Sequence, residues 1–105
     1  MAAVKVCKAG DLAPGMATRA MLDGTPVAIF NADGTYYALG DTCSHEEASL
    51  SEGELYPEDC EVECPKHGAV FNLETGQPRT LPATRPVPVF ATKIVDGDLY
   101  VETKP

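Results

Sequence analysis

The sequence lacks an apolar run close to the ~20 residues that a membrane-spanning helix needs. Its opening residues, MAAVKVCKAG, also lack the uninterrupted apolar segment of a signal peptide. We therefore expect a soluble, cytoplasmic protein that does not bind membranes.

Basic residues are scarce, because Lys and Arg together number 8, against 16 Asp and Glu, and the formal charge is −8. Such a charge opposes binding to nucleic acid or to an anionic membrane, since both carry negative charge themselves. It favours a partner protein with a basic surface. An acid excess can also serve only to keep a protein soluble, and charge alone does not separate the two interpretations.

Tryptophan is absent, and 9 Gly with 9 Pro make turns frequent in a chain of 105 residues. One domain with a modest core fits this length, and short elements between turns favour an all-β fold over a helical bundle. The dipeptides Asp23-Gly24, Asp33-Gly34 and Asp96-Gly97 are typical of β-hairpins. We expect antiparallel strands of a sandwich or barrel at residues 4–8, 17–22, 25–31, 35–39, 70–73, 87–95 and 99–102.

Residues 40–65 interrupt this series of strands, because acidic and small residues dominate there. We interpret the segment as a site-bearing insertion on a β scaffold, with a helical turn over residues 46–51.

The chain has only two histidines, and each follows a cysteine by two or three positions. The first pair is Cys43 and His45 in CSH, and the second is Cys64 and His67 in CPKH. Disulfides need no histidine, so the pairing indicates metal ligation rather than oxidation.

Several metal sites use cysteine and histidine. Zinc fingers usually pair like ligands, C-x2–4-C followed by H-x3–5-H, whereas each segment here offers one ligand of each kind. A blue-copper site needs two His, one Cys and an axial Met, and no Met lies near these segments. The remaining well-known solution is a [2Fe–2S] cluster with the cysteines on one iron and the histidines on the other.

The pattern C-x-H followed by C-x2-H, with Pro65 and Gly68 completing CPKHG, resembles the Rieske motif. Asp41 before the first pair, LSEG at 50–53 and TGQPRTLPA at 75–83 extend the likeness. Over nearly its full length the chain resembles the Rieske ferredoxins of bacterial aromatic-ring dioxygenase systems.

The resemblance implies an antiparallel β sandwich or barrel of the Rieske type, forming a single domain over residues 1–105. A cluster-binding subdomain of about residues 41–83 would be inserted in a basal β domain. The implied cofactor is a Rieske-type [2Fe–2S] cluster, and its implied ligands are Cys43, His45, Cys64 and His67.

Supporting residues are implied as well. Gly53 and Gly68 would let the backbone approach the cluster, and Pro65 would stiffen the second ligand segment. Pro82 would cover one side of the cluster and exclude water. The histidines would face outward, so that electrons leave through their ring edges.

The implied function is one-electron transfer and not catalysis, since the chain is too short to hold the mononuclear iron domain of the oxygenases as well. A monomer would take electrons from an NAD(P)H-dependent flavoprotein reductase and pass them to a terminal Rieske oxygenase. Glu46, Glu47 and Glu52 are candidates to steer docking, although they can equally be a solvated rim. Two alternatives stay open: a small Rieske-like subunit of an assimilatory nitrite reductase, and a zinc-stabilised interaction module.

Departures from the respiratory Rieske proteins predict a low reduction potential. Those proteins carry a disulfide between the ligand segments, where this chain has Ala48 and Lys66. They also use a Ser and a Tyr to hydrogen-bond sulfur atoms, where this chain has Ala69 and Phe71. Fewer donors leave the reduced cluster less stabilised, which indicates the low end of the Rieske range of about −150 to +300 mV.

Two cysteines are surplus to this ligand set. Cys7 and Cys60 are expected to be buried or idle thiols that pack as small hydrophobes.

Overall fold

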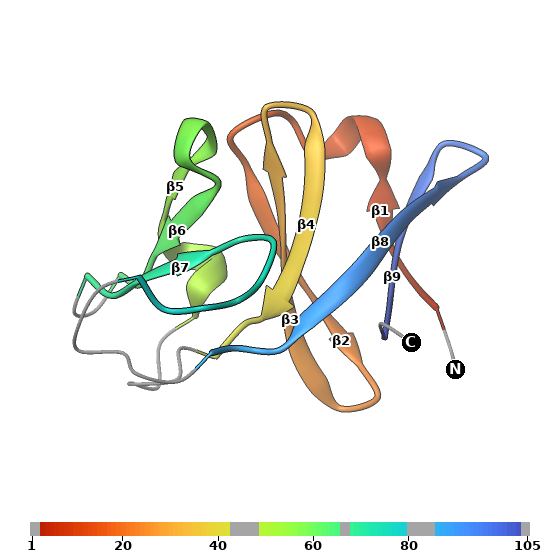
Figure 1. Cartoon of the computed structure of the whole chain (residues 1–105). Helices are drawn as coiled ribbons and strands as arrows, with labels where there is room; N and C mark the ends of the chain where they lie inside the picture. Colours follow the sequence, from red (N-terminus) through yellow and green to blue (C-terminus); the bar gives the residue numbers. More distant parts are fainter. Residues whose placement is uncertain (1–2, 43–48, 66–67, 80–85, 104–105) are drawn as a thin grey trace.

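The computed structural model describes residues 3–42, 49–65, 68–79 and 86–103. These ranges form nine β-strands and three short 3-10 helices (Figure 1). In chain order the elements are β1 Val4–Lys8, η1 Ala9–Asp11, β2 Ala17–Leu22, β3 Thr25–Ala32, β4 Thr35–Gly40, η2 Leu50–Glu52, β5 Glu54–Tyr56, η3 Pro57–Asp59, β6 Glu61–Glu63, β7 Val70–Asn72, β8 Val89–Val95 and β9 Asp98–Thr103.

Two antiparallel sheets make up the fold. The larger has the strand order β1-β9-β8-β4-β3-β2, and its two edge strands, β1 and β2, also contact each other, so that it is nearly a closed barrel. The smaller has the order β5-β6-β7 and lies beside the barrel, on the left in Figure 1. The expected all-β, antiparallel fold is confirmed.

Strand β3 is buried on both faces and therefore links the two parts of the core. Ala28 and Phe30 belong to the hydrophobic cluster that lies between the sheets. Val27 and Ile29, on the other face, belong to a second cluster within the barrel. Because side chains alternate along a strand, this continuous apolar run needs a neighbour on each side of the sheet.

The three Asp-Gly hairpin turns form as predicted. Asp23, Asp33 and Asp96 have φ values of 49°, 54° and 52°, and the glycine after each also has a positive φ. Positive φ at both central residues is the type I′ geometry that matches the twist of paired strands.

Strand positions agree with the sequence pattern except in the middle of the chain. The expectation that residues 40–65 lie outside the strand pattern was wrong, because β5 and β6 lie there and pair with each other from Glu54↔Glu63 to Tyr56↔Glu61. Both strands are only three residues long, ELY and EVE, so they give almost no strand signal. The described part of the expected helical turn at 46–51 contributes Leu50 and Ser51 to the 3-10 helix η2.

Candidate metal centre

Cys64, the one predicted ligand among the described residues, lies directly after β6 in the β6–β7 hairpin. Cys64 is 1% exposed and belongs to the core cluster between the sheets. The hairpin register pairs Val62 with Phe71 and Glu63 with Val70. Alternation then places Val62 and Cys64 on the same buried face, while the glutamates of β6 point the other way.

The second ligand segment is closed by backbone hydrogen bonds at its two ends. The Cys64 amide donates to the carbonyl oxygen of Ala69 at 2.7 Å, and the Gly68 amide donates to the carbonyl oxygen of Cys64 at 3.1 Å. Gly68 has a φ of +72°, which favours glycine over any residue with a side chain. The CPKHG segment therefore has its two ends fixed to each other.

The first ligand segment is also closed at its base. Thr42 and Ser49, which flank residues 43–48, form an antiparallel bridge. Next to it the Leu50 amide donates to the Asp41 carbonyl oxygen at 2.7 Å, and the Ser51 amide donates to the Asp41 side-chain oxygen Oδ1 at 2.9 Å.

Several predicted residues lie outside the described ranges, and the structure says nothing of them. They are the ligands Cys43, His45 and His67, together with Glu46, Glu47, Ala48, Lys66 and Pro82. Of the glutamates proposed to steer docking, Glu52 is described and is exposed.

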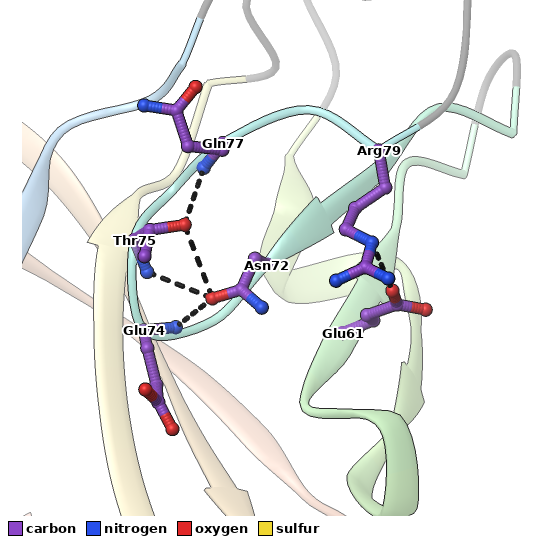
Figure 2. Close-up of polar contacts among 6 residues, drawn as sticks. All are labelled: Glu61, Asn72, Glu74, Thr75, Gln77 and Arg79. Atoms are coloured by element: carbon purple, nitrogen blue, oxygen red, sulfur yellow. Dashed lines mark hydrogen bonds and ion pairs between the residues drawn. The ribbon is translucent and has the colours of Figure 1, made fainter.

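The segment before residues 80–85 is fixed to the small sheet by its polar side chains. Figure 2 shows Asn72 Oδ1 accepting the amides of Glu74 and Thr75 at 2.8 and 3.0 Å. In the same view Arg79 Nε lies 2.8 Å from Glu61 Oε2 on β6. The same turn also contacts the chain beyond residue 85, because the Val87 amide donates a hydrogen bond to the Gly76 carbonyl oxygen at 2.9 Å.

A tyrosine that the sequence did not single out lies beside the second ligand segment. The Tyr56 hydroxyl donates to Glu63 Oε1 at 2.7 Å and lies 3.0 Å from Glu54 Oε2. These hydrogen bonds, first that to Glu63, raise the pKa of Tyr56 above its usual range. Only the strand register of β5 and β6 brings the three side chains together, so no sequence motif signals the contact.

The two surplus cysteines are half-buried free thiols. Burial, with a contribution from Asp11, raises the pKa of Cys7. Cys60 ends η3 in the left-handed conformation, and its sulfur lies 3.9 Å from Glu74 Oε1. A hydrogen bond with Cys60, followed by burial, raises the pKa of Tyr37.

The surroundings of Cys64 suit a cysteine whose sulfur binds an iron–sulfur cluster. Cys64 is shielded from water, on a hairpin whose backbone geometry favours glycine at position 68. Burial in an apolar cluster disfavours an isolated thiolate, whereas bonding to iron compensates its charge. Two open grooves, of about 430 and 400 Å³, lie elsewhere, at the η3 turn and between β4 and β8, and Cys64 lines neither of them.

None of the helices in the described ranges is both long and apolar enough to cross a membrane.

Comparison with known proteins gives a family and close relatives. The model of the Rieske [2Fe-2S] domain family matches residues 2–91. Ferredoxin CarAc of Metapseudomonas resinovorans is 42% identical over 99 residues, which cover 93% of this chain and 91% of that protein. The 3-phenylpropionate/cinnamic acid dioxygenase ferredoxin subunit of Escherichia coli is 42% identical over 100 residues, covering 94% and 92% of the two chains.

Solved structures agree with these relatives. A chain in the complex of reduced oxygenase and oxidized ferredoxin in carbazole 1,9a-dioxygenase has a TM-score of 0.89 and 42% identity, covering 98% of this chain and 96% of its own length. A putative NADH-dependent nitrite reductase small subunit from Mycobacterium tuberculosis is more distant, at 26% identity and a TM-score of 0.82, with 95% and 93% of the chains covered.

Proposed function

Because the chain belongs to the Rieske [2Fe-2S] domain family, we propose that it is the ferredoxin of a bacterial aromatic-ring-hydroxylating dioxygenase system. The observation that carries this proposal is 42% identity, over more than nine-tenths of each chain, to two ferredoxins of this kind. The protein is an electron carrier and not itself an enzyme. The nitrite reductase alternative is less well supported, since the similarity to that small subunit is lower in both sequence and structure.

The cofactor is a Rieske-type [2Fe–2S] cluster, which supplies the uptake and release of one electron. We propose that Cys43 and Cys64 hold one iron, and that His45 and His67 hold the other. Support comes from the burial of Cys64 and from the closed bases of both ligand segments. The domain division, 1–105 with a cluster-binding subdomain at about 41–83, is proposed on the same grounds, because the small sheet lies between β4 and β8 in the chain.

We further propose that the electron comes from an NAD(P)H-dependent flavoprotein reductase in the cytoplasm and passes to a terminal oxygenase. The similar ferredoxin chain in complex with its oxygenase supports the second partner. A monomer that docks each partner in turn needs only small, weak interfaces. Since both partners would use the surface around His45 and His67, they would compete for it.

Turnover of a purified oxygenase and reductase, with and without the ferredoxin, tests the function. We expect turnover to require the ferredoxin, and equal turnover without it would refute the carrier role. If acidic residues steer docking, the rate falls as ionic strength rises, because at ~0.15 M salt the Debye length is only about 8 Å.

The steering role has its own variant and control. Glu46→Gln with Glu47→Gln should flatten the salt dependence of turnover. Asp33→Asn with Asp96→Asn removes the same charge from two hairpin turns, at positive φ values that Asn tolerates, and should leave the dependence unchanged. The turn that contains Asp33 precedes β4, whereas Asp41 and the first ligand segment follow the opposite end of that strand. Equal effects of the two double variants would show that net charge and not position matters.

A further inference from the structure

The carboxylate of Asp41 is buried beside the first ligand segment. Asp41 is 2% exposed, and with Asn31 it makes up the buried polar or charged residues in the described part of the chain. Carboxylates are almost never fully buried without partners, because the charged form loses its hydration. The partners of Asp41 therefore decide what this charge does.

Each oxygen of the carboxylate has a different partner. Oδ1 accepts the Ser51 amide at 2.9 Å, whereas Oδ2 lies 3.6 Å from Arg19 Nη1 on β2. The same Arg19 nitrogen donates to Ser49 Oγ at 3.4 Å. Arg19 thus contacts residues on both sides of the segment 43–48, and it does so from a different part of the barrel.

The two charges of this pair differ in how firmly they are held. The side chain of Asp41 is 2% exposed and receives a backbone hydrogen bond, while that of Arg19 is 53% exposed. Among the described residues, a single nitrogen of Arg19 contacts both Asp41 and Ser49. The negative charge is therefore fixed in the protein, and the positive charge that offsets it comes from a half-exposed side chain.

The position of the pair matters for electron uptake. Asp41 precedes Cys43 by two residues, and two residues of chain span at most about 7 Å. A fixed negative charge so near the site of reduction disfavours an added electron, since reduction potentials depend on the local charge. A cation against that carboxylate acts in the opposite direction.

We propose that the Arg19–Asp41 pair sets the reduction potential of the cluster, with Arg19 raising the potential by offsetting the buried Asp41 carboxylate beside Cys43. The proposal rests on the proposed ligation by Cys43. Both side chains act through the segment that they hold and through their charge, so they are positioning residues.

Voltammetry of purified holoproteins at one fixed pH and low ionic strength tests this. Arg19→Met should lower the potential, since the carboxylate loses its compensating charge. Asp41→Asn should raise it, because the amide keeps an oxygen for the Ser51 amide while the negative charge is lost. The double variant should lie between them, near the unsubstituted protein.

Lys5→Met is the matched control for loss of one cation. Lys5 forms an ion pair with Asp98 at 3.4 Å on β1 and β9, the strands at the far side of the barrel from the small sheet (Figure 1). We expect no shift of the potential in this variant. Shifts of Arg19→Met and Asp41→Asn in the same direction, or no larger than that of Lys5→Met, would overturn the proposal.

Loss of the cluster, in Asp41→Asn or in the unsubstituted protein, would also be informative. If Asp41→Asn does not retain a cluster, the comparison of Arg19→Met with Lys5→Met decides alone, since Arg19 is half-exposed and its loss is tolerable to the fold. If the unsubstituted protein binds no Rieske-type cluster, the proposed function fails as well. A normal cluster with a potential that ignores Arg19 refutes only the role of the pair.

Discussion

Gly53 lies directly against the backbone of Glu63, and a Cβ at Gly53 would overlap the Glu63 carbonyl oxygen. Gly53 has a φ of −80° and a ψ of 175°, which any residue adopts, so the need for glycine is one of space. Gly53 follows η2, close after the first ligand segment, and Glu63 immediately precedes Cys64. This contact therefore joins the chain leaving one ligand segment to the chain entering the other.

Gly53→Ala should separate these two parts of the chain. Overpacking against backbone typically costs about 1–3 kcal/mol, and we expect a loss of unfolding free energy in that range. Chelator-driven loss of the cluster should also be faster. Gly10→Ala is the control, because a Cβ there meets nothing within 4 Å and the position is exposed. Equal stability of the two variants would show that the Gly53–Glu63 contact is not required.

Phe71→Tyr should raise the reduction potential. Phe71 is fully buried and shares the inward face of the β6–β7 hairpin with Cys64. A new hydroxyl that donates to a sulfur stabilises the reduced, more negative cluster. Ala69→Ser should act in the same direction but more weakly. Voltammetry measures the shift, and Phe90→Tyr, on β8, should show none.

The Phe71→Tyr variant can also contradict our explanation of the low potential. It would do so if the new hydroxyl is confirmed to donate a hydrogen bond to sulfur and the potential nevertheless stays unchanged.

The Tyr56 hydroxyl should stabilise the protein only below alkaline pH. Its raised pKa means that the hydrogen bonds to Glu63 and Glu54 contribute fully below the unfolded-state pKa of about 10. Above that pH the unfolded state loses its proton first, so the contribution declines. The difference in melting temperature between the unsubstituted protein and Tyr56→Phe should be constant from pH 7 to about 9 and then shrink. A difference in melting temperature that grows above pH 10 would contradict this prediction.

The cysteines should differ in whether the cluster needs them. Cys64→Ser should abolish the cluster spectrum, whereas Cys7→Ser and Cys60→Ser should retain it, because both surplus thiols are half-buried and lie outside the ligand set. His45→Ala and His67→Ala should also lose the Rieske-type spectrum, since the chain has no spare histidine. Iron content and visible absorption measure the outcome. A normal spectrum in either histidine variant would disprove that ligation.

Local sequence signals predicted much of the fold. The Asp-Gly turns and the alternating or continuous apolar runs located β1 and β2 at their observed bounds, residues 4–8 and 17–22, and located the other long strands to within two residues. These signals succeed because turn geometry and strand burial depend on neighbouring residues. The strands β5 and β6 were missed because three residues with outward glutamates are fixed by pairing and not by their own composition.

The candidate site likewise combines features that follow from local sequence with features that depend on the tertiary fold. Cysteine and histidine spacing is a local property, so the sequence alone yields a proposed ligand set, of which the structure describes Cys64. The contact between Arg19 and Asp41 depends instead on where β2 lies in the barrel, and that between Gly53 and Glu63 depends on how η2 meets β6. Neither relationship leaves a periodic pattern, and the left-handed backbone of Cys60 has no sequence signal either.

Mössbauer spectroscopy of the reduced protein, enriched in iron-57, tests the central claim most directly. Two cysteines on one iron and two histidines on the other make the two irons chemically different, and imidazole ligation favours the added electron on the histidine-bound iron. We therefore predict two distinct iron sites in equal amounts, of which only the histidine-bound one becomes ferrous on reduction. Two equivalent sulfur-ligated irons, or a protein that contains zinc and no iron, would contradict the account.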